Sequence, residues 1–375
     1  MPPTGENRDS AELIDALRLT LVSGVGPRIR QDLLERFGDP ADVLAASPSE
    51  LRSVPGVGPK LVDRILAARD DPRVFEELEL CRQHRISILL PTDQQYPRSL
   101  AEIHDPPGAL FVAGSIEPHD SLAIAIVGSR HATQYGKQQA QKLAASLSRA
   151  GLTIVSGLAR GIDAAAHRGA LEAGGRTLAV LGGGVLQIYP PEHKELAFDV
   201  SRSGAILSEQ PPNFVPVGGS FPQRNRLISG LSLGVIVVEA AERSGALISA
   251  RHAMEQGREV FAVPGRVDSR MSRGCHRLLR DGAKLVESAD DVLEELGPLV
   301  EPTMRADGTS IHHPAELQLN EIEQAVLQAI DLSPTSIDKV ATSASLPVHR
   351  VLSTVSVLEM RRLVRRVSGN QVIRV

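Results

Sequence analysis

Six short apolar runs alternate with amphipathic segments between Leu122 and Leu296, and this alternation restricts the fold more than any other feature of the 375-residue chain. The runs span residues 122–127, 153–155, 177–181, 205–208, 235–239 and 259–263. Runs of this length are typical of buried strands, and the segments between them have the period of helices. Strands that alternate with helices form βαβ units. The sequence therefore predicts an α/β fold, with a Rossmann-like parallel sheet as its core.

Residues 1–71 are predicted to form a separate domain of helices joined by short turns. Two similar passages, Val22-Ser-Gly-Val-Gly-Pro27 and Val54-Pro-Gly-Val-Gly-Pro59, each precede an amphipathic stretch and mark an internal repeat. Their turns resemble the helix-hairpin-helix (SAM-like) module, in which glycines let backbone N–H groups approach a DNA phosphate. Because this block carries twelve acids against nine bases, a DNA contact and a purely structural turn both remain open.

The remaining boundaries follow from changes in pattern. The Rossmann-like domain is assigned to residues 72–297, and its first part, residues 72–121, is a proline-rich lead-in segment that is either irregular or made of small strands. Residues 298–314 contain few apolar side chains and are predicted to be a linker. Residues 315–375 show three helical patterns and a hairpin turn at Ser368-Gly369-Asn370, which predicts a winged helix with residues 346–362 as its recognition helix. DNA and protein are equally good partners for this domain.

Composition excludes several classes of protein. No apolar run reaches the ~18 residues of a membrane-spanning helix, and the first ten residues lack the apolar core of a signal peptide. We therefore expect a cytoplasmic protein without a membrane partner. The two cysteines, Cys81 and Cys275, are far apart and belong to no Cys-x-x-Cys motif. Neither a metal site nor any other cofactor is predicted, and no Walker A motif indicates ATP binding.

Positive charge is concentrated in one part of an acidic chain. The net charge is −4, which argues against indiscriminate coating of nucleic acid. Between Phe221 and Lys284, however, eleven Lys and Arg residues stand against six acids. Most of these arginines could solvate helix faces, or some could form a surface that binds a polyanion.

The loops that follow the predicted strands carry glycine, hydroxyl and cationic residues. In a parallel sheet, ligands bind outside the carboxyl ends of the strands, near helix N-termini. Arg224, Asn225 and Arg226 are predicted to open a helix there, and Phe221 beside them either stacks on a base or packs as a buried staple. The full set of predicted DNA-binding residues is Gly128, Ser129, Arg130, Ser156, Gly157, Phe221, Arg224, Asn225, Arg226, Ser244 and Gly245. Together they predict an extended phosphate-binding surface.

Catalytic groupings are missing from these loops. No Gly-x-Gly-x-x-Gly follows the first strand, and this argues against a dinucleotide-binding site. Asp163 and His167 are spaced to meet on one helix face, but no serine or cysteine nucleophile can be placed beside them. We interpret this pair as a helix-start cap and a packed histidine, and we predict no catalytic residue.

Six motifs taken together resemble the DNA-processing protein DprA family, also called Smf. They include Ile126-Val-Gly-Ser-Arg130, Ser156-Gly-Leu-Ala-Arg-Gly-Ile-Asp163 and Phe221-Pro-Gln-Arg-Asn-Arg-Leu-Ile-Ser-Gly-Leu-Ser232, and the match runs in order along the whole chain. The resemblance implies sequence-independent binding and protection of single-stranded DNA, a homodimer formed through the Rossmann-like domain, and loading of the RecA recombinase in natural transformation. It also implies that Gly128, Ser129 and Arg130 line the strand with residues 224–226, while Phe221 contacts a base.

An enzyme on the same fold is the alternative. The core also resembles phosphoribohydrolases that release a base from a nucleoside monophosphate. Those proteins carry Pro-Gly-Gly-x-Gly-Thr-x-x-Glu, whereas this chain has Glu239-Ala-Ala-Glu-Arg-Ser-Gly-Ala-Leu247 at the corresponding strand end. Without the paired glycines and the trailing carboxylate, the phosphate loop and the general acid/base are both incomplete. A binding protein is therefore favoured.

Overall fold

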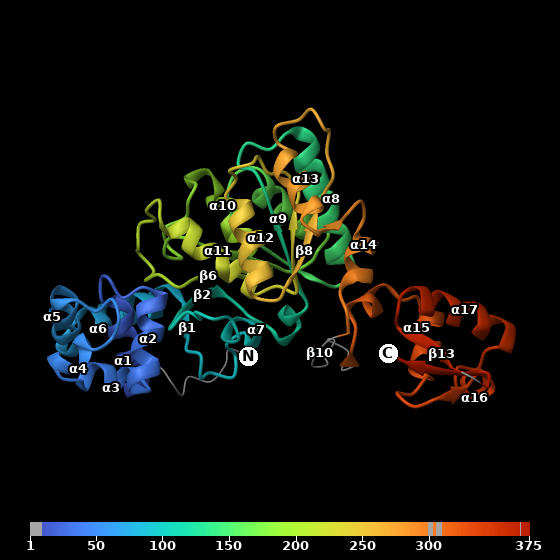
Figure 1. Cartoon of the computed structure of the whole chain (residues 1–375), viewed down its shortest axis with the longest axis horizontal. Helices are drawn as coiled ribbons and strands as arrows, with labels where there is room; N and C mark the ends of the chain where they lie inside the picture. Colours follow the sequence, from blue (N-terminus) through green and yellow to red (C-terminus); the bar gives the residue numbers. More distant parts are fainter. Residues whose placement is uncertain (1–9, 299–302, 305–309, 368) are drawn as a thin grey trace.

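A computed structural model describes residues 10–298, 303–304, 310–367 and 369–375 of the chain. It shows three parts, with the helical N-terminal part and the C-terminal part on opposite sides of a central α/β part (Figure 1). Residues 1–9, residues 299–302 and 305–309 of the expected linker, and Ser368 of the expected hairpin turn lie outside the described residues. Residues 303–304 and 310–311 of that linker pair as the short antiparallel strands β10 (Thr303–Met304) and β11 (Ser310–Ile311).

The N-terminal part consists of helices, as the sequence predicts. Its elements are α1 (Ala11–Leu21), α2 (Pro27–Phe37), α3 (Pro40–Ala45), α4 (Pro48–Arg52), α5 (Pro59–Ala67) and the 3₁₀ turn Ala68–Asp70. Gly24 and Gly56 adopt φ values of +101° and +81°, a conformation that glycine accepts without strain. Gly26 and Gly58 then cap α2 and α5. The two repeated passages thus build the same helix–turn–helix unit twice.

The central part is built on a nine-stranded sheet with the order β1-β2-β6-β5-β4-β3-β7-β8-β9. The six predicted strands are β3 (Ala123–Val127), β4 (Thr153–Ser156), β5 (Thr177–Val180), β6 (Ala205–Ser208), β7 (Gly234–Val237) and β8 (Glu259–Ala262), and all are parallel. A short strand, β9 (Lys284–Leu285), extends one edge in parallel. The predicted parallel core is confirmed.

The lead-in segment extends the other edge of the same sheet. It contains α6 (Arg73–His84), β1 (Ser87–Leu89), α7 (Arg98–Ala101), β2 (Leu110–Gly114) and the 3₁₀ turn Pro118–Ser121. Strand β2 pairs antiparallel with β6, and β1 pairs antiparallel with β2. This segment is therefore part of the core sheet, which its prolines and short apolar pieces did not reveal.

Helices cover both faces of the sheet. On one face lie α8 (Gln134–Arg149), α9 (Ile162–Glu172), α10 (Lys194–Ser203) and α14 (Ala289–Glu295), and on the other lie α11 (Ser220–Gly230), α12 (Ala246–Glu255) and α13 (Arg273–Arg280). Side chains of β3 alternate between the layers: Ile124 and Ile126 pack in one, and Ala125 and Val127 pack in the other. No helix of the described residues has the length and apolarity to span a bilayer.

The C-terminal part has the topology of a winged helix. The 3₁₀ turn Pro314–Gln318 leads into α15 (Glu321–Gln328), α16 (Ile337–Ser343) and α17 (Val348–Met360). Strands β12 (Thr335–Ser336), β13 (Val364–Val367) and β14 (Gln371–Arg374) form a sheet in the order β12-β14-β13. Helix α17 occupies the predicted recognition position, so the sequence prediction of this fold is confirmed.

Phe261 tests how much the central sheet contributes to stability. Its ring is fully buried on β8 and fills the space above Gly234, where an added Cβ would lie 2.8 Å from the ring. We expect Phe261→Ala to lower the free energy of unfolding by about 3–5 kcal/mol, because a large cavity remains. Phe198→Ala is the control, since that ring is 60% exposed and its loss should cost within about 0.5 kcal/mol. Equal losses in urea denaturation would contradict the assignment of the core.

Candidate nucleic-acid interface

The main candidate site is a cavity of about 680 Å³ where the winding of the sheet reverses direction. Strands β3 and β7 are neighbours in the sheet, but β3 continues into α8 on one face and β7 into α12 on the other. The loops after these strands therefore separate and leave a crevice, the position at which α/β proteins bind ligands. We name this cavity the switch-point pocket. Eight predicted site residues line it: Gly128, Ser129, Arg130, Phe221, Arg224, Asn225, Ser244 and Gly245.

Arg130 and Phe221 form the exposed side of the pocket. The Arg130 guanidinium carbon lies 5.0 Å from the centre of the Phe221 ring, within the range of a cation–π contact. Phe221 is half-buried, and its ring also lies 5.7 Å from the ring of Tyr189 at an interplanar angle of 46°. The contact holds a cation and an aromatic ring side by side at the cavity. Tyr189 is an aromatic neighbour that the predicted site omitted.

Arg224 forms the floor of the pocket with Asp163. Its side chain is 5% exposed, and its Nη1 donates to the Val180 carbonyl. Burial lowers the pKa of Arg224 to about 10, with the charge of Asp163 opposing the shift, so the guanidinium is still cationic at neutral pH. Burial likewise raises the pKa of Asp163, although Arg224 opposes this and the Gly157 and Ala159 amides donate to the carboxylate. The two buried charges balance each other beneath the cavity.

Hydrogen bonds from backbone and side-chain groups fix the loops around the pocket. The Ser129 amide donates to the Glu239 carbonyl at 2.7 Å, which ties the loop after β3 to the end of β7. The Ser129 hydroxyl accepts from the His131 amide. Across the cavity, Asn225 Nδ2 donates to the Gly245 carbonyl at 3.2 Å. The pocket is thus held by contacts among the three segments that line it.

Three predicted residues do not line the pocket. Ser156 is buried and donates its hydroxyl to the Ile126 carbonyl. Gly157 lies below the floor, where an added Cβ would come within 2.2 Å of Arg224 Nη1, so its lack of a side chain makes room for the guanidinium. Arg226 is 3% exposed and bonds to Asp105 and Glu209 through its Nε and Nη2 atoms, at 2.8 and 2.7 Å.

The expectation that residues 224–226 together open a helix is wrong. Helix α11 begins at Ser220, so the triplet lies in its second turn, and Pro222 occupies the first turn, where its missing N–H costs no helix bond. Successive helical side chains point about 100° apart because a turn contains ~3.6 residues. Arg224 and Arg226 therefore face different surroundings, and only Arg224 reaches the cavity.

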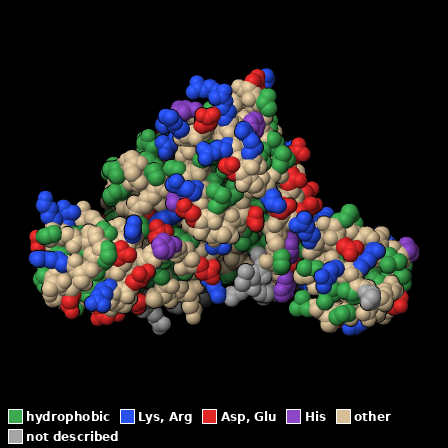
Figure 2. Space-filling view, viewed as in Figure 1, with side chains coloured by type: hydrophobic (Ala, Val, Ile, Leu, Met, Phe, Trp, Pro, Cys, Tyr) green, Lys and Arg blue, Asp and Glu red, His purple; other side chains and the backbone are tan. Residues whose placement is uncertain are grey.

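The rim of the pocket carries cations without carboxylate partners. Arg130 and Arg243 are exposed, and neither forms an ion pair with a carboxylate in the part of the chain that the structure describes. Lys and Arg side chains gather at the apex of the central part, over α13 and the neighbouring loops (Figure 2). Arg243 was counted in the basic segment but left out of the predicted site, although it directly precedes Ser244 after a strand end.

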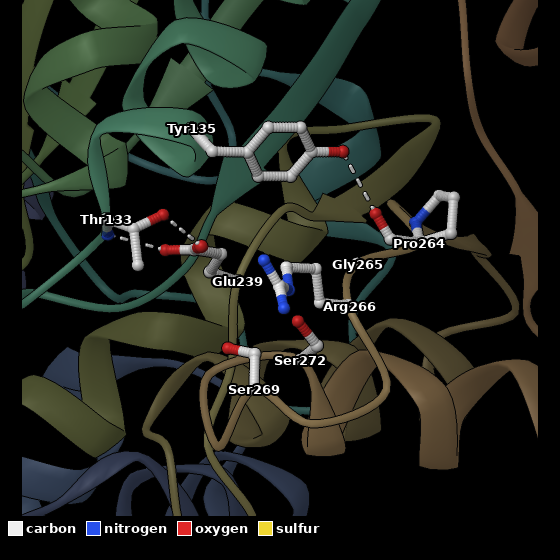
Figure 3. Close-up of a pocket in the computed structure, with 8 residues that line it drawn as sticks. All are labelled: Thr133, Tyr135, Glu239, Pro264, Gly265, Arg266, Ser269 and Ser272. Atoms are coloured by element: carbon white, nitrogen blue, oxygen red, sulfur yellow. Dashed lines mark hydrogen bonds between the residues drawn. The ribbon is translucent and has the colours of Figure 1, made fainter.

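A second cavity, of about 610 Å³, is lined by the side chain of Glu239, whose carbonyl bonds to Ser129 at the switch-point pocket. We name it the Tyr135 pocket. Its lining residues, all drawn in Figure 3, are Thr133, Tyr135, Glu239, Pro264, Gly265, Arg266, Ser269 and Ser272. The Glu239 carboxylate accepts from the amide and the hydroxyl of Thr133, at 2.8 and 2.6 Å. The carboxylate of Glu239, the first residue of the segment that was compared with the phosphoribohydrolase motif, therefore faces this second pocket and holds the start of α8.

Two histidines of the central part contact neighbouring protein groups. His167 is fully buried with Nδ1 2.7 Å from the Thr177 hydroxyl, which agrees with its interpretation as a packed histidine. His276 Nε2 lies 2.9 Å from the Gly265 carbonyl. Among the residues described, no cluster of three His, Cys, Asp or Glu side chains is suited to hold a metal ion.

Arg226 should act on stability through its two ion pairs. We expect Arg226→Ala to lower the free energy of unfolding by about 3–5 kcal/mol, because Glu209 and Asp105 lose the cation that compensates them. Arg251→Ala removes an exposed arginine whose contact with Glu255 spans 3.8 Å, so it should cost at most about 1 kcal/mol. Denaturant titration of both variants measures the difference, and an Arg226 variant as stable as the Arg251 variant would contradict the structural role.

Comparison with known proteins gives matches along most of the chain. The family profile "DNA recombination-mediator protein A" matches residues 87–297, "SAM-like Helix-hairpin-helix tandem" matches residues 16–71, and "DprA winged helix domain" matches residues 311–370. Protein Smf of Synechocystis is 35% identical over 380 residues, covering 93% of this chain and 95% of that protein.

Two solved structures resemble the chain. DNA processing protein A (DprA) of Streptococcus pneumoniae has 37% identity and a TM-score of 0.67, and the match covers 76% of this chain and 97% of that one. DNA processing protein A of Helicobacter pylori, whose structure is described as showing a single-stranded DNA binding mode, has 33% identity and a TM-score of 0.51. That match covers 56% of this chain and 94% of that one.

Proposed function

Because the chain belongs to the DprA (Smf) family of DNA recombination-mediator proteins, we propose that it binds single-stranded DNA in the switch-point pocket without regard to sequence. By this binding it protects incoming DNA and loads the RecA recombinase in natural transformation. The Helicobacter pylori relative, with its single-stranded DNA binding mode, supports the choice of ligand. The protein acts by holding the strand, and the proposal includes no bond-breaking step.

The contact between Arg130 and Phe221 is the observation that carries this proposal. A nucleotide presents a charged phosphate and a flat base a short distance apart, and this pair presents a cation and an aromatic ring at 5.0 Å. Stacking on an aromatic ring tolerates any base, because every base has a π face. A guanidinium binds a phosphate through two parallel N–H donors. The pair therefore suits a strand of arbitrary sequence.

The charge distribution of the pocket supports phosphate as the group that binds at the rim. The carboxylate that lines the cavity, Asp163, is buried beside Arg224. Its negative charge therefore offsets mainly the charge of Arg224 at the floor, and the rim stays positive. Arg130 and Arg243 then provide two exposed cations that form no ion pair with a carboxylate among the described residues. Attraction of phosphates to such a rim is electrostatic and falls with salt.

We also propose that the protein forms a homodimer through its Rossmann-like domain. Strand β9 is the edge of the nine-stranded sheet on that side, and both of its residues are exposed. An uncovered edge offers unpaired backbone groups to another chain. Leu285 adds an exposed apolar side chain at this edge, which supports an interface with a second copy.

Arg130 provides the direct test of the binding site. We expect Arg130→Ala to weaken binding of single-stranded DNA roughly tenfold or more, because a charge-assisted phosphate contact is lost. The slope of log affinity against log salt should fall by about 0.7 for each phosphate contact removed. Fluorescence anisotropy titrations at several salt concentrations measure both quantities.

Arg202→Ala is the matched control for this experiment. Arg202 is also an exposed arginine above a phenylalanine, with its guanidinium carbon 5.9 Å from the centre of the Phe198 ring, but it lies on α10 and does not line the pocket. Its replacement should leave affinity and salt slope unchanged. If both variants bind like the wild-type protein, the switch-point pocket is not the DNA site.

Loading of the recombinase is tested separately. On single-stranded DNA covered by a single-strand binding protein, the wild-type chain should shorten the lag before RecA filaments form, whereas Arg130→Ala should not, because the strand is no longer held. The lag is measured from the onset of RecA ATP hydrolysis. A wild-type chain that binds DNA but leaves the lag unchanged would refute the loading function and leave the binding function in place.

A further inference from the structure

We propose that the Tyr135 pocket accepts one base of the bound strand, stacked on Tyr135, and favours bases that carry an exocyclic amine. This inference rests on the proposed binding of single-stranded DNA in the switch-point pocket. It adds a second subsite, with a base preference of its own, to a protein whose first subsite tolerates any base.

The two pockets are adjacent because the same residues help to form both. The carbonyl of Glu239 accepts from the Ser129 amide at the switch-point pocket, and the carboxylate of Glu239 lines the Tyr135 pocket. The loop after β8 is shared as well: Met271 lines the first cavity, and Ser269 and Ser272 line the second. A strand that leaves Arg130 therefore meets the Tyr135 pocket next.

The walls of the Tyr135 pocket suit a flat aromatic ligand. Tyr135 is 47% exposed, and its hydroxyl donates to the Pro264 carbonyl at 3.1 Å, which fixes the ring at the mouth of the cavity. Figure 3 shows Tyr135, Arg266, Ser269 and Ser272 around the same cavity. An exposed aromatic ring at the mouth of a cavity is a surface on which a base can stack.

Charge decides that the ligand group here is a base and not a phosphate. The Arg266 guanidinium is already paired with Asp268, with Nε–Oδ1 and Nη2–Oδ2 distances of 3.0 and 2.9 Å. The other charged group of the lining is the Glu239 carboxylate, which repels a phosphate. The switch-point pocket has the opposite balance, since Arg130 and Arg243 lack described ion pairs. Phosphates therefore bind at the first pocket and a neutral base at the second.

Glu239 supplies the preference among bases. Its side chain is 4% exposed, and each of its oxygens accepts one hydrogen bond from Thr133. A carboxylate has about four lone-pair sites, so each oxygen can accept a further bond from the cavity. Cytosine offers the N4 amine and adenine the N6 amine, whereas thymine has a carbonyl at the equivalent position. We therefore expect cytosine and adenine to be preferred to thymine.

Affinity measurements on the full chain test the proposal with dC and dT oligonucleotides of about 15 nucleotides. The wild-type protein should bind dC more tightly than dT. Tyr135→Ala should lose about tenfold in affinity for dC, because the stacked base is released. Tyr135→Phe should recover most of that loss, since the ring remains. Glu239→Gln should reduce the preference for dC over dT. Circular dichroism establishes that each variant is folded, and Phe198→Ala, on α10, is the unaffected control.

The outcomes separate this inference from the proposed function. If the wild-type chain binds neither oligonucleotide, the proposed function fails and the subsite fails with it. If the wild-type chain binds both but with equal affinity, the base preference is overturned and the proposed function stands. If Tyr135→Ala binds dC as tightly as the wild type does, the stacking subsite is overturned and the proposed function again stands. The comparison of dC with dT on the wild-type protein is decisive even where a variant does not fold, because equal affinities contradict the preference.

Discussion

The hydrogen bond between the Ser129 amide and the Glu239 carbonyl joins the two strand ends on which the site depends. Parallel strands β3 and β7 lie side by side, but the helices that follow them pack on opposite faces of the sheet. Their loops would diverge without a contact at the point of separation. The Glu239 side chain adds a second contact by accepting from Thr133 at the start of α8. One residue thus fixes both loops and leaves a cavity on each side of itself.

Buried charge explains why the rim of the switch-point pocket stays positive. A lone buried Arg224 or Asp163 would be costly to desolvate, and each lowers the cost of the other. The charges of Arg224 and Arg130 both act on the Asp163 carboxylate, Arg224 the more strongly, so two cations stand against this one acid and the pocket keeps a net positive charge. Gly157 makes the arrangement possible, since any side chain there would collide with the Arg224 guanidinium. The glycine after β4 is therefore a packing requirement for the floor of the site.

The sequence predicted the strands, the helix-hairpin-helix repeat and the winged helix because each leaves a local signal: buried apolar runs, glycine turns at equal offsets, and a helical period. It did not predict β1 and β2 as strands of the core sheet, because β2 joins that sheet by antiparallel pairing with β6, about a hundred residues away, and β1 joins it only through β2. The direction in which the Arg226 side chain points could not be predicted from the neighbouring sequence either. That direction depends on where α11 begins, at Ser220, and on two carboxylates, Asp105 and Glu209, that lie outside the basic segment.

The same limit applies to the positive charge counted along the sequence. Within the basic segment, Arg226, Arg266 and Arg273 each lie within 4 Å of a carboxylate, and so contribute little free charge. Arg130, which lies outside that segment, has no described carboxylate partner and stacks on Phe221 instead. A charge excess along the chain is therefore a weak guide to where a polyanion binds. The better guide is an arginine that follows a strand at the switch point, contacts an aromatic ring and forms no ion pair with a described carboxylate. By that criterion we expect the two pockets to bind different groups, although both are lined by arginine.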